Sequence, residues 1–110
     1  MSIFEERLWK KDKILRRRIE IDNTLYEGLQ KIVEEYDTNI SNLVNISIEN
    51  LIKTEKVKLY ERAEDEIVEA HNFSIREGFY RELEKLRSKY GISVYKLTNI
   101  AIYNALNDRI

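Results

Sequence analysis

Two stretches of the chain are copies of one another. Residues 19–52 read IEIDNTLYEGLQKIVEEYDTNISNLVNISIENLI, and residues 73–106 read FSIREGFYRELEKLRSKYGISVYKLTNIAIYNAL. They align without a gap at an offset of 54 positions, and ten of the 34 aligned pairs are identical. These pairs are Ile21/Ile75, Tyr26/Tyr80, Leu29/Leu83, Lys31/Lys85, Tyr36/Tyr90, Leu43/Leu97, Asn45/Asn99, Ile46/Ile100, Ile48/Ile102 and Asn50/Asn104. The chain therefore contains two copies of one small structural unit, which decides the fold.

Each copy begins with a segment in which polar and apolar residues alternate. In the first, Arg16, Arg18 and Glu20 are polar while Ile19 and Ile21 are apolar; in the second, Asn72 and Ser74 alternate with Phe73 and Ile75. Alternation with a period of two predicts a short, half-buried strand. A helix with one apolar stripe follows in each copy. Gly91 can end this helix in the second copy by adopting the left-handed conformation, and we expect Asp37 to do the same in the first.

A second helix follows, and Asn39 and Ser93 are the expected N-cap residues of its two copies. Apolar residues, including Ile46 and Ile100, occupy nearly every side of it, so it is expected to be buried between several neighbours. One copy cannot supply those neighbours, so the two copies must pack together. The two strands then pair antiparallel. We expect a mainly α fold with a short β-ribbon, forming one intramolecular pseudo-twofold domain, with a swapped dimer as the alternative.

This pattern of strand, helix, polar or glycine turn and capped buried helix resembles the ribbon-helix-helix family of the Arc and MetJ type. Two motifs in one chain resemble the tandem accessory DNA-binding proteins of conjugative-plasmid relaxosomes. The resemblance implies a basic N-terminal arm over residues 1–15 and a first repeat over 16–53. A connector over 54–69 and a second repeat over 70–110 follow. In the connector Tyr60, Ala63 and Ile67 fall at helical spacing, so it is either an extra helix or an extended link.

The family lays its ribbon in the DNA major groove, which is wide enough to admit two strands. Strand alternation turns Ile19, Ile21, Phe73 and Ile75 toward the core. The residues expected to face the bases are Arg16, Arg18, Glu20, Asn72 and Ser74, together with Ala70. The two halves differ, so an asymmetric double-stranded DNA site is expected. Glu20 departs from what binding to a polyanion suggests, and it either selects cytosine or holds a neighbouring arginine.

Phosphate contacts are expected from two sources. One is the basic segment at the start of the chain, with Lys10, Lys11 and Lys13. The other is the N-terminus of each second helix, Asn39-Ile40-Ser41 and Ser93-Val94-Tyr95, which the family uses as a phosphate clamp. The sequence does not distinguish phosphate binding at these positions from simple helix capping, because both use overlapping groups.

Charge and composition bound the function. Residues 1–18 carry seven Lys or Arg against three acids, whereas the whole chain has a net charge of −1. There is no cysteine and His71 is the only histidine, so neither a zinc site nor an enzyme is expected, and no cofactor is needed. No secretory or membrane segment is evident, which favours a cytoplasmic location.

We therefore expect sequence-specific DNA binding, in plasmid transfer or in transcription regulation. The expected state is a monomer equivalent to one family dimer, able to associate on DNA and to meet a relaxase or another protein. The alternative is an antitoxin-type interaction module that neutralises a partner protein through residues 1–15 or 54–69.

Overall fold

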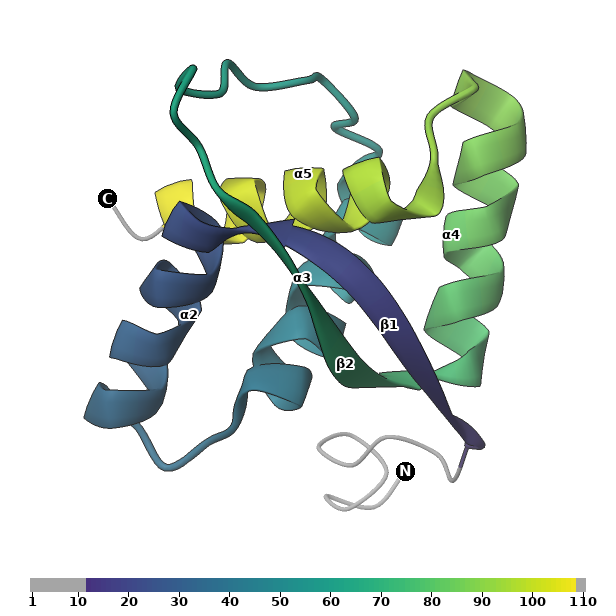
Figure 1. Ribbon diagram of the computed structural model, residues 1–110. Coiled ribbons are helices and arrows are strands. Elements are labelled where there is room, and N and C mark those ends of the chain that lie inside the picture. Colours follow the sequence, from purple (N-terminus) through teal and green to yellow (C-terminus); the bar gives the residue numbers. More distant parts are fainter. Residues whose placement is uncertain (1–11, 109–110) are drawn as a thin grey trace.

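The computed structural model describes residues 12–108. Within this range each half of the chain forms a strand followed by two helices (Figure 1). The elements in order are β1 (Ile14–Asp22), α2 (Asn23–Glu35), α3 (Ile40–Thr54), β2 (Val68–Arg76), α4 (Glu77–Tyr90) and α5 (Val94–Asn107). The ribbon of β1 and β2 lies across α3 and α5, with α2 and α4 at its two sides. This arrangement confirms the expected fold class and the intramolecular pairing of the two copies.

The two strands pair antiparallel in a register that obeys the repeat. Arg18 lies opposite Asn72, and these two residues are also equivalent at the offset of 54 positions. A pseudo-twofold axis therefore passes through the middle of the ribbon. Each strand has nine residues, so both begin two residues before the boundaries expected at residues 16 and 70.

The helix ends follow local chemistry. Asn39 and Ser93 cap α3 and α5, as expected, by accepting hydrogen bonds from the amides of Asn42 and Lys96. Gly91 ends α4 with φ 67°, in the left-handed region that glycine adopts without strain. The expectation for Asp37 is wrong, because α2 ends at Glu35 and Tyr36 follows in an extended conformation.

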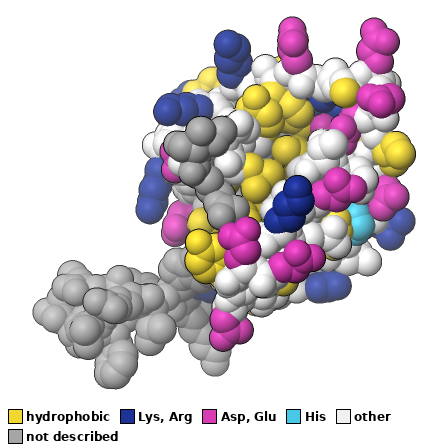
Figure 2. Space-filling view, turned by 90° about the vertical axis from the view of Figure 1, so that its left-hand side faces the viewer, with side chains coloured by type: hydrophobic (Ala, Val, Ile, Leu, Met, Phe, Trp, Pro, Cys, Tyr) yellow, Lys and Arg dark blue, Asp and Glu magenta, His cyan; other side chains and the backbone are white. Residues whose placement is uncertain are grey.

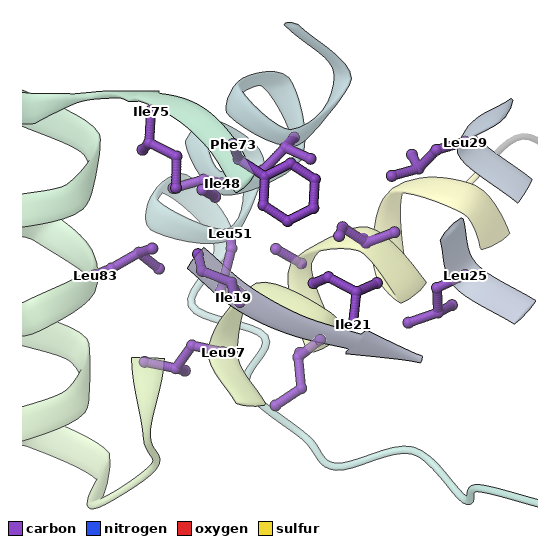
Figure 3. Packing of buried hydrophobic residues seen from close by; sticks show 14 of the residues in the cluster. Ile19, Ile21, Leu25, Leu29, Ile48, Leu51, Phe73, Ile75, Leu83 and Leu97 are labelled. Atoms are coloured by element: carbon purple, nitrogen blue, oxygen red, sulfur yellow. The ribbon is translucent and has the colours of Figure 1, made fainter. Parts of the chain in front are cut away.

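The core lies between the inner face of the ribbon and the four helices, and both halves contribute to it. Ile19 and Ile21 of β1 and Phe73 and Ile75 of β2 are buried, which confirms the expected alternation. Leucines and isoleucines from the four helices converge on these side chains (Figure 3). Burial of apolar surface contributes about 25 cal/mol per Å², so this shared core stabilises the pairing of the two halves.

The two copies of the second helix are not buried alike. Ile100 of α5 is 1% exposed, whereas its equivalent in α3, Ile46, is 45% exposed. The expectation that Ile46 lies in the shared core is therefore wrong. The reason lies outside the repeat. The connector crosses α5 near Ile100, where Tyr60 stacks on Tyr103 and Asn104 donates to the Lys56 carbonyl, but Ile46 of α3 has no such cover among the described residues.

Residues 55–67 link the two halves without forming a helix; a turn lies at residues 64–65. The helical alternative for the connector is therefore wrong. Tyr60 and Val57 instead pack individually against the core. The side chain of Tyr60 stacks on that of Tyr103 with 4.5 Å between ring centroids.

Gly28 stands in the middle of α2, where glycine weakens a helix by about 1 kcal/mol relative to alanine. A Cβ at this position would lie 2.9 Å from Cδ1 of Leu106 in α5. The glycine therefore permits the close approach of α2 and α5.

Among the described residues, no helix is long and apolar enough to cross a membrane.

The pseudo-equivalent isoleucines provide a matched test of this packing. We expect Ile100→Asp to destabilise the fold by several kcal/mol, because it places an unpaired carboxylate in the core. That cost is comparable to the total stability of a small domain. Ile46→Asp should leave the chain folded, with a small shift in melting temperature. Thermal melts followed by circular dichroism would contradict this packing if the two variants melted at the same temperature.

Candidate nucleic-acid interface

The outward face of the ribbon carries the side chains that the sequence assigned to base contacts. Arg16, Arg18, Glu20 and Asn72 are exposed, and Ser74 is half-buried. Across the two strands, Arg16 lies opposite Ser74, Arg18 opposite Asn72 and Glu20 opposite Ala70. The structure thus brings all the expected residues together in one row. That they contact DNA stays a prediction.

The Arg16 and Ser74 side chains are linked across the strands. Nη1 of Arg16 donates a hydrogen bond of 2.8 Å to Oγ of Ser74. Arg17, between the two outward arginines, points to the inner side and is half-buried. Its guanidinium lies 5.0 Å from the centroid of the Tyr80 ring and donates to the Arg16 carbonyl. Arg17 therefore has a structural role, whereas Arg16 and Arg18 extend outward.

The ribbon has a basic end and an acidic end. The basic end lies where β1 begins and β2 finishes: Arg76 pairs with Ile14 and Arg16 with Ser74, and Lys13 directly precedes β1. The acidic end lies where β1 leads into α2 and holds Glu20 and Glu69. Figure 2 views the side of the molecule that carries α2, where acidic side chains are interspersed with Lys and Arg side chains. Charges of the opposite sign also lie at each end, Asp12 and Glu77 at the basic one and Arg62 and Lys96 at the acidic one, so the two ends differ in the outward side chains of the strands and not in charge of a single sign.

The helix N-termini flank the two ends. At the basic end Ser41 of α3 accepts a hydrogen bond of 3.0 Å from the amide of Ser74, so its hydroxyl is already engaged by the ribbon. At the acidic end the equivalent residue, Tyr95, is 43% exposed. Asn39 and Ser93 are confirmed as caps, and Ile40 and Val94 are half-buried beside them. Phosphate binding at these termini stays a prediction.

Of the three lysines expected to contact phosphate, the structure describes one. Lys13 is exposed next to the basic end of the ribbon. Lys10 and Lys11 lie outside the described residues. No group of three or more His, Asp or Glu side chains within residues 12–108 is arranged to hold a metal ion.

Two asparagines fix the outer edges of the ribbon, and the sequence analysis assigned them no role. Asn45 of α3 donates to the Ser74 carbonyl at 2.8 Å and accepts from the Arg76 amide at 2.9 Å. Asn99 of α5 makes the equivalent pair of bonds to the other strand. Each amide thus satisfies one carbonyl and one N–H that a two-stranded ribbon leaves open. The signal available in the sequence was that Asn45 and Asn99 form one of the identical pairs of the repeat.

Each strand is preceded by an acidic residue that the sequence analysis also passed over. The Asp12 carboxylate accepts a hydrogen bond of 3.0 Å from the Gly78 amide at the start of α4. Glu66 accepts one of 2.9 Å from the Thr24 amide at the start of α2. Both are positioned at the positive end of a helix dipole, which favours a carboxylate. Each cap comes from the segment before one strand and serves the helix after the other strand.

A buried carboxylate stands beside the acidic end. Asp22 is 4% exposed, and its oxygens bind Arg62 at 2.9 Å and the Tyr60 hydroxyl at 2.5 Å. Burial, reinforced by the hydrogen bond to Asp22, raises the pKa of the Tyr60 hydroxyl above its usual range. These residues line a cavity of about 320 Å³ together with Tyr95 and Lys96 of α5. Tyr60 and Arg62 of the connector therefore form part of the surface next to the N-terminus of α5.

Comparison with known proteins adds no identification. A scan against protein-family models finds no match, and searches of curated proteins and of solved structures find none either. The topology itself, with two strand-helix-helix repeats and antiparallel pairing of their strands, is consistent with a tandem ribbon-helix-helix arrangement.

The asparagine contacts can be tested directly. Asn99→Ala leaves the Glu20 carbonyl and the buried Asp22 amide without their partner. Each unsatisfied buried group costs about 1–3 kcal/mol. The free energy of unfolding, measured by urea denaturation, should therefore fall by that amount or more. Asn107→Ala in the same helix removes only an exposed local bond to the Tyr103 carbonyl and serves as the control. Equal stability of the two variants would show that the ribbon edge does not depend on Asn99.

Proposed function

We propose that this chain binds double-stranded DNA sequence-specifically by laying its two-stranded ribbon in the major groove. The observation that carries the proposal is the row of polar side chains on the outward face of a ribbon whose inner face is buried. The major groove is about 12 Å wide and admits a two-stranded ribbon. In this role the chain acts without catalysis, as an accessory protein of plasmid transfer or as a transcriptional regulator.

The chemistry of the row supports base recognition. An arginine such as Arg18 can donate two hydrogen bonds to O6 and N7 of guanine, and Asn72 can bind N6 and N7 of adenine. These two residues face one another at the centre of the ribbon. Arg16 is already oriented by Ser74, which reduces the side-chain entropy that a base contact would cost.

The difference between the two ends supports an asymmetric site. At the basic end Arg16, Arg76 and Lys13 provide attraction to phosphates. At the acidic end Glu20 is the outward side chain of β1, opposite Ala70. The phosphates repel a carboxylate in the groove, and a hydrogen bond accepted from cytosine N4 would offset part of that repulsion. We infer that the half of the site at the basic end contributes most of the affinity.

The most direct experiment is selection of bound DNA from a random pool, followed by titration of the selected site at several salt concentrations. We expect one non-palindromic consensus and an affinity that falls steeply with salt, because phosphate contacts release counterions. Failure to enrich any sequence, with no salt-dependent binding to duplex DNA, would reject the proposal.

Within that assay Arg18 and Arg17 form a matched pair on opposite faces of the ribbon. Arg18→Ala should lose about 1–3 kcal/mol of discrimination at one position of the site. The slope of the logarithm of its binding constant against the logarithm of salt concentration should change by at most about one unit. Arg17→Ala should lower the melting temperature, because it removes the contact with Tyr80, and should leave the base preference intact. Loss of specificity in Arg17→Ala but not in Arg18→Ala would overturn the assignment of the reading residues.

A further inference from the structure

The surface of α3 around Ile46 is the exposed counterpart of a surface that α5 keeps covered. Ile46 and Ile100 are identical in the repeat, as are Asn50 and Asn104. At α5 the connector supplies the cover. Leu59 and Tyr60 line a cavity with Ile100, and the Asn104 amide donates a hydrogen bond of 2.9 Å to the Lys56 carbonyl. The isoleucine and the asparagine of α5 therefore both lie against the segment that precedes β2.

The segment that precedes β1 starts along the equivalent path. The Lys13 carbonyl accepts a hydrogen bond of 2.8 Å from the Glu77 amide, and the Ile67 carbonyl accepts one of 2.8 Å from the Asn23 amide. Asp12 and Glu66 then cap α4 and α2 through one further equivalent bond each. At the repeat offset, positions 12–13 correspond to 66–67. The pseudo-twofold symmetry of the ribbon thus extends into both preceding segments.

We propose that the surface of α3 around Ile46 and Asn50 is the docking site of residues 1–11 of the same chain. Thirteen residues precede β1, and thirteen, 55–67, separate α3 from β2, so the first segment has the length needed to follow the equivalent path. Glu5 and Glu6 stand where the connector has Leu59 and Tyr60, so the apolar contact with Ile46 falls to the flanking apolar residues; they are Ile3, Phe4, Leu8 and Trp9. Burial of such side chains against Ile46 removes apolar area from water. Asn50 is placed to donate to a backbone carbonyl, as Asn104 does.

The inference is independent of DNA binding, since it concerns packing within the free protein. Docking would bring Arg7, Lys10 and Lys11 beside the basic end of the ribbon. It would therefore add to the charge difference between the two ends.

The absence of cysteine from the chain allows a site-specific test in the full-length protein. A nitroxide label is attached through Ser2→Cys, at the position equivalent to Lys56. The NMR intensities of the backbone amides are then compared before and after reduction of the label. We expect the signals of α3 around Ile46 and Asn50 to lose most of their intensity selectively. Ile46→Asp, or Phe4→Ser on the segment itself, should restore them. The control Ile67→Asp, at a residue 61% exposed on the connector, should leave the loss unchanged.

Each alternative has its own outcome. Absence of selective loss in α3, or no recovery in either Ile46→Asp or Phe4→Ser, would overturn the proposal. A second copy as the occupant would show itself in a mixed sample, where one chain carries the label and the other the isotope. Loss at α3 arising only between chains would replace the intramolecular contact with a contact between copies.

Discussion

Satisfying the open edges of the two-stranded ribbon is the constraint on which the remaining structure depends. A lone pair of strands exposes one row of backbone groups on each side, and such rows are costly to bury and prone to pair with other chains. Asn45 and Asn99 each satisfy one carbonyl and one N–H of an edge through a side-chain amide that both donates and accepts. Because the asparagines belong to α3 and α5, the same contacts determine how these helices sit under the ribbon.

The repeat made most of the fold predictable, because a repeat can be recognised from the sequence without any knowledge of the tertiary contacts. The inward set Ile19, Ile21, Phe73 and Ile75 followed from alternation alone, and the caps Asn39 and Ser93 followed from local hydrogen-bonding chemistry. What lies outside the repeat was not predictable in this way. The helical spacing of Tyr60, Ala63 and Ile67 was misleading, because Tyr60 is fixed by contacts with Asp22 and Tyr103.

The exposure of Ile46 illustrates the same limit from the other direction. Periodicity treats Ile46 and Ile100 alike, since both occupy the same position in the same helix. Their burial differs because it depends on the segment that crosses the helix, which the repeat does not contain. Of the candidate site, the outward row could be predicted from alternation. The opposite character of its two ends could not be, because it depends on which side chains the strand register brings together.

Pairing within one chain has a consequence for how this protein responds to its own abundance. A ribbon assembled from two separate chains exists only in proportion to the dimer, so dilution unfolds it and occupancy of a target varies with the square of concentration at low levels. Here both strands belong to one chain, so the ribbon can form without a second copy. A substitution in one half of the chain also leaves the other half unaltered, which is not so when two identical chains form the ribbon.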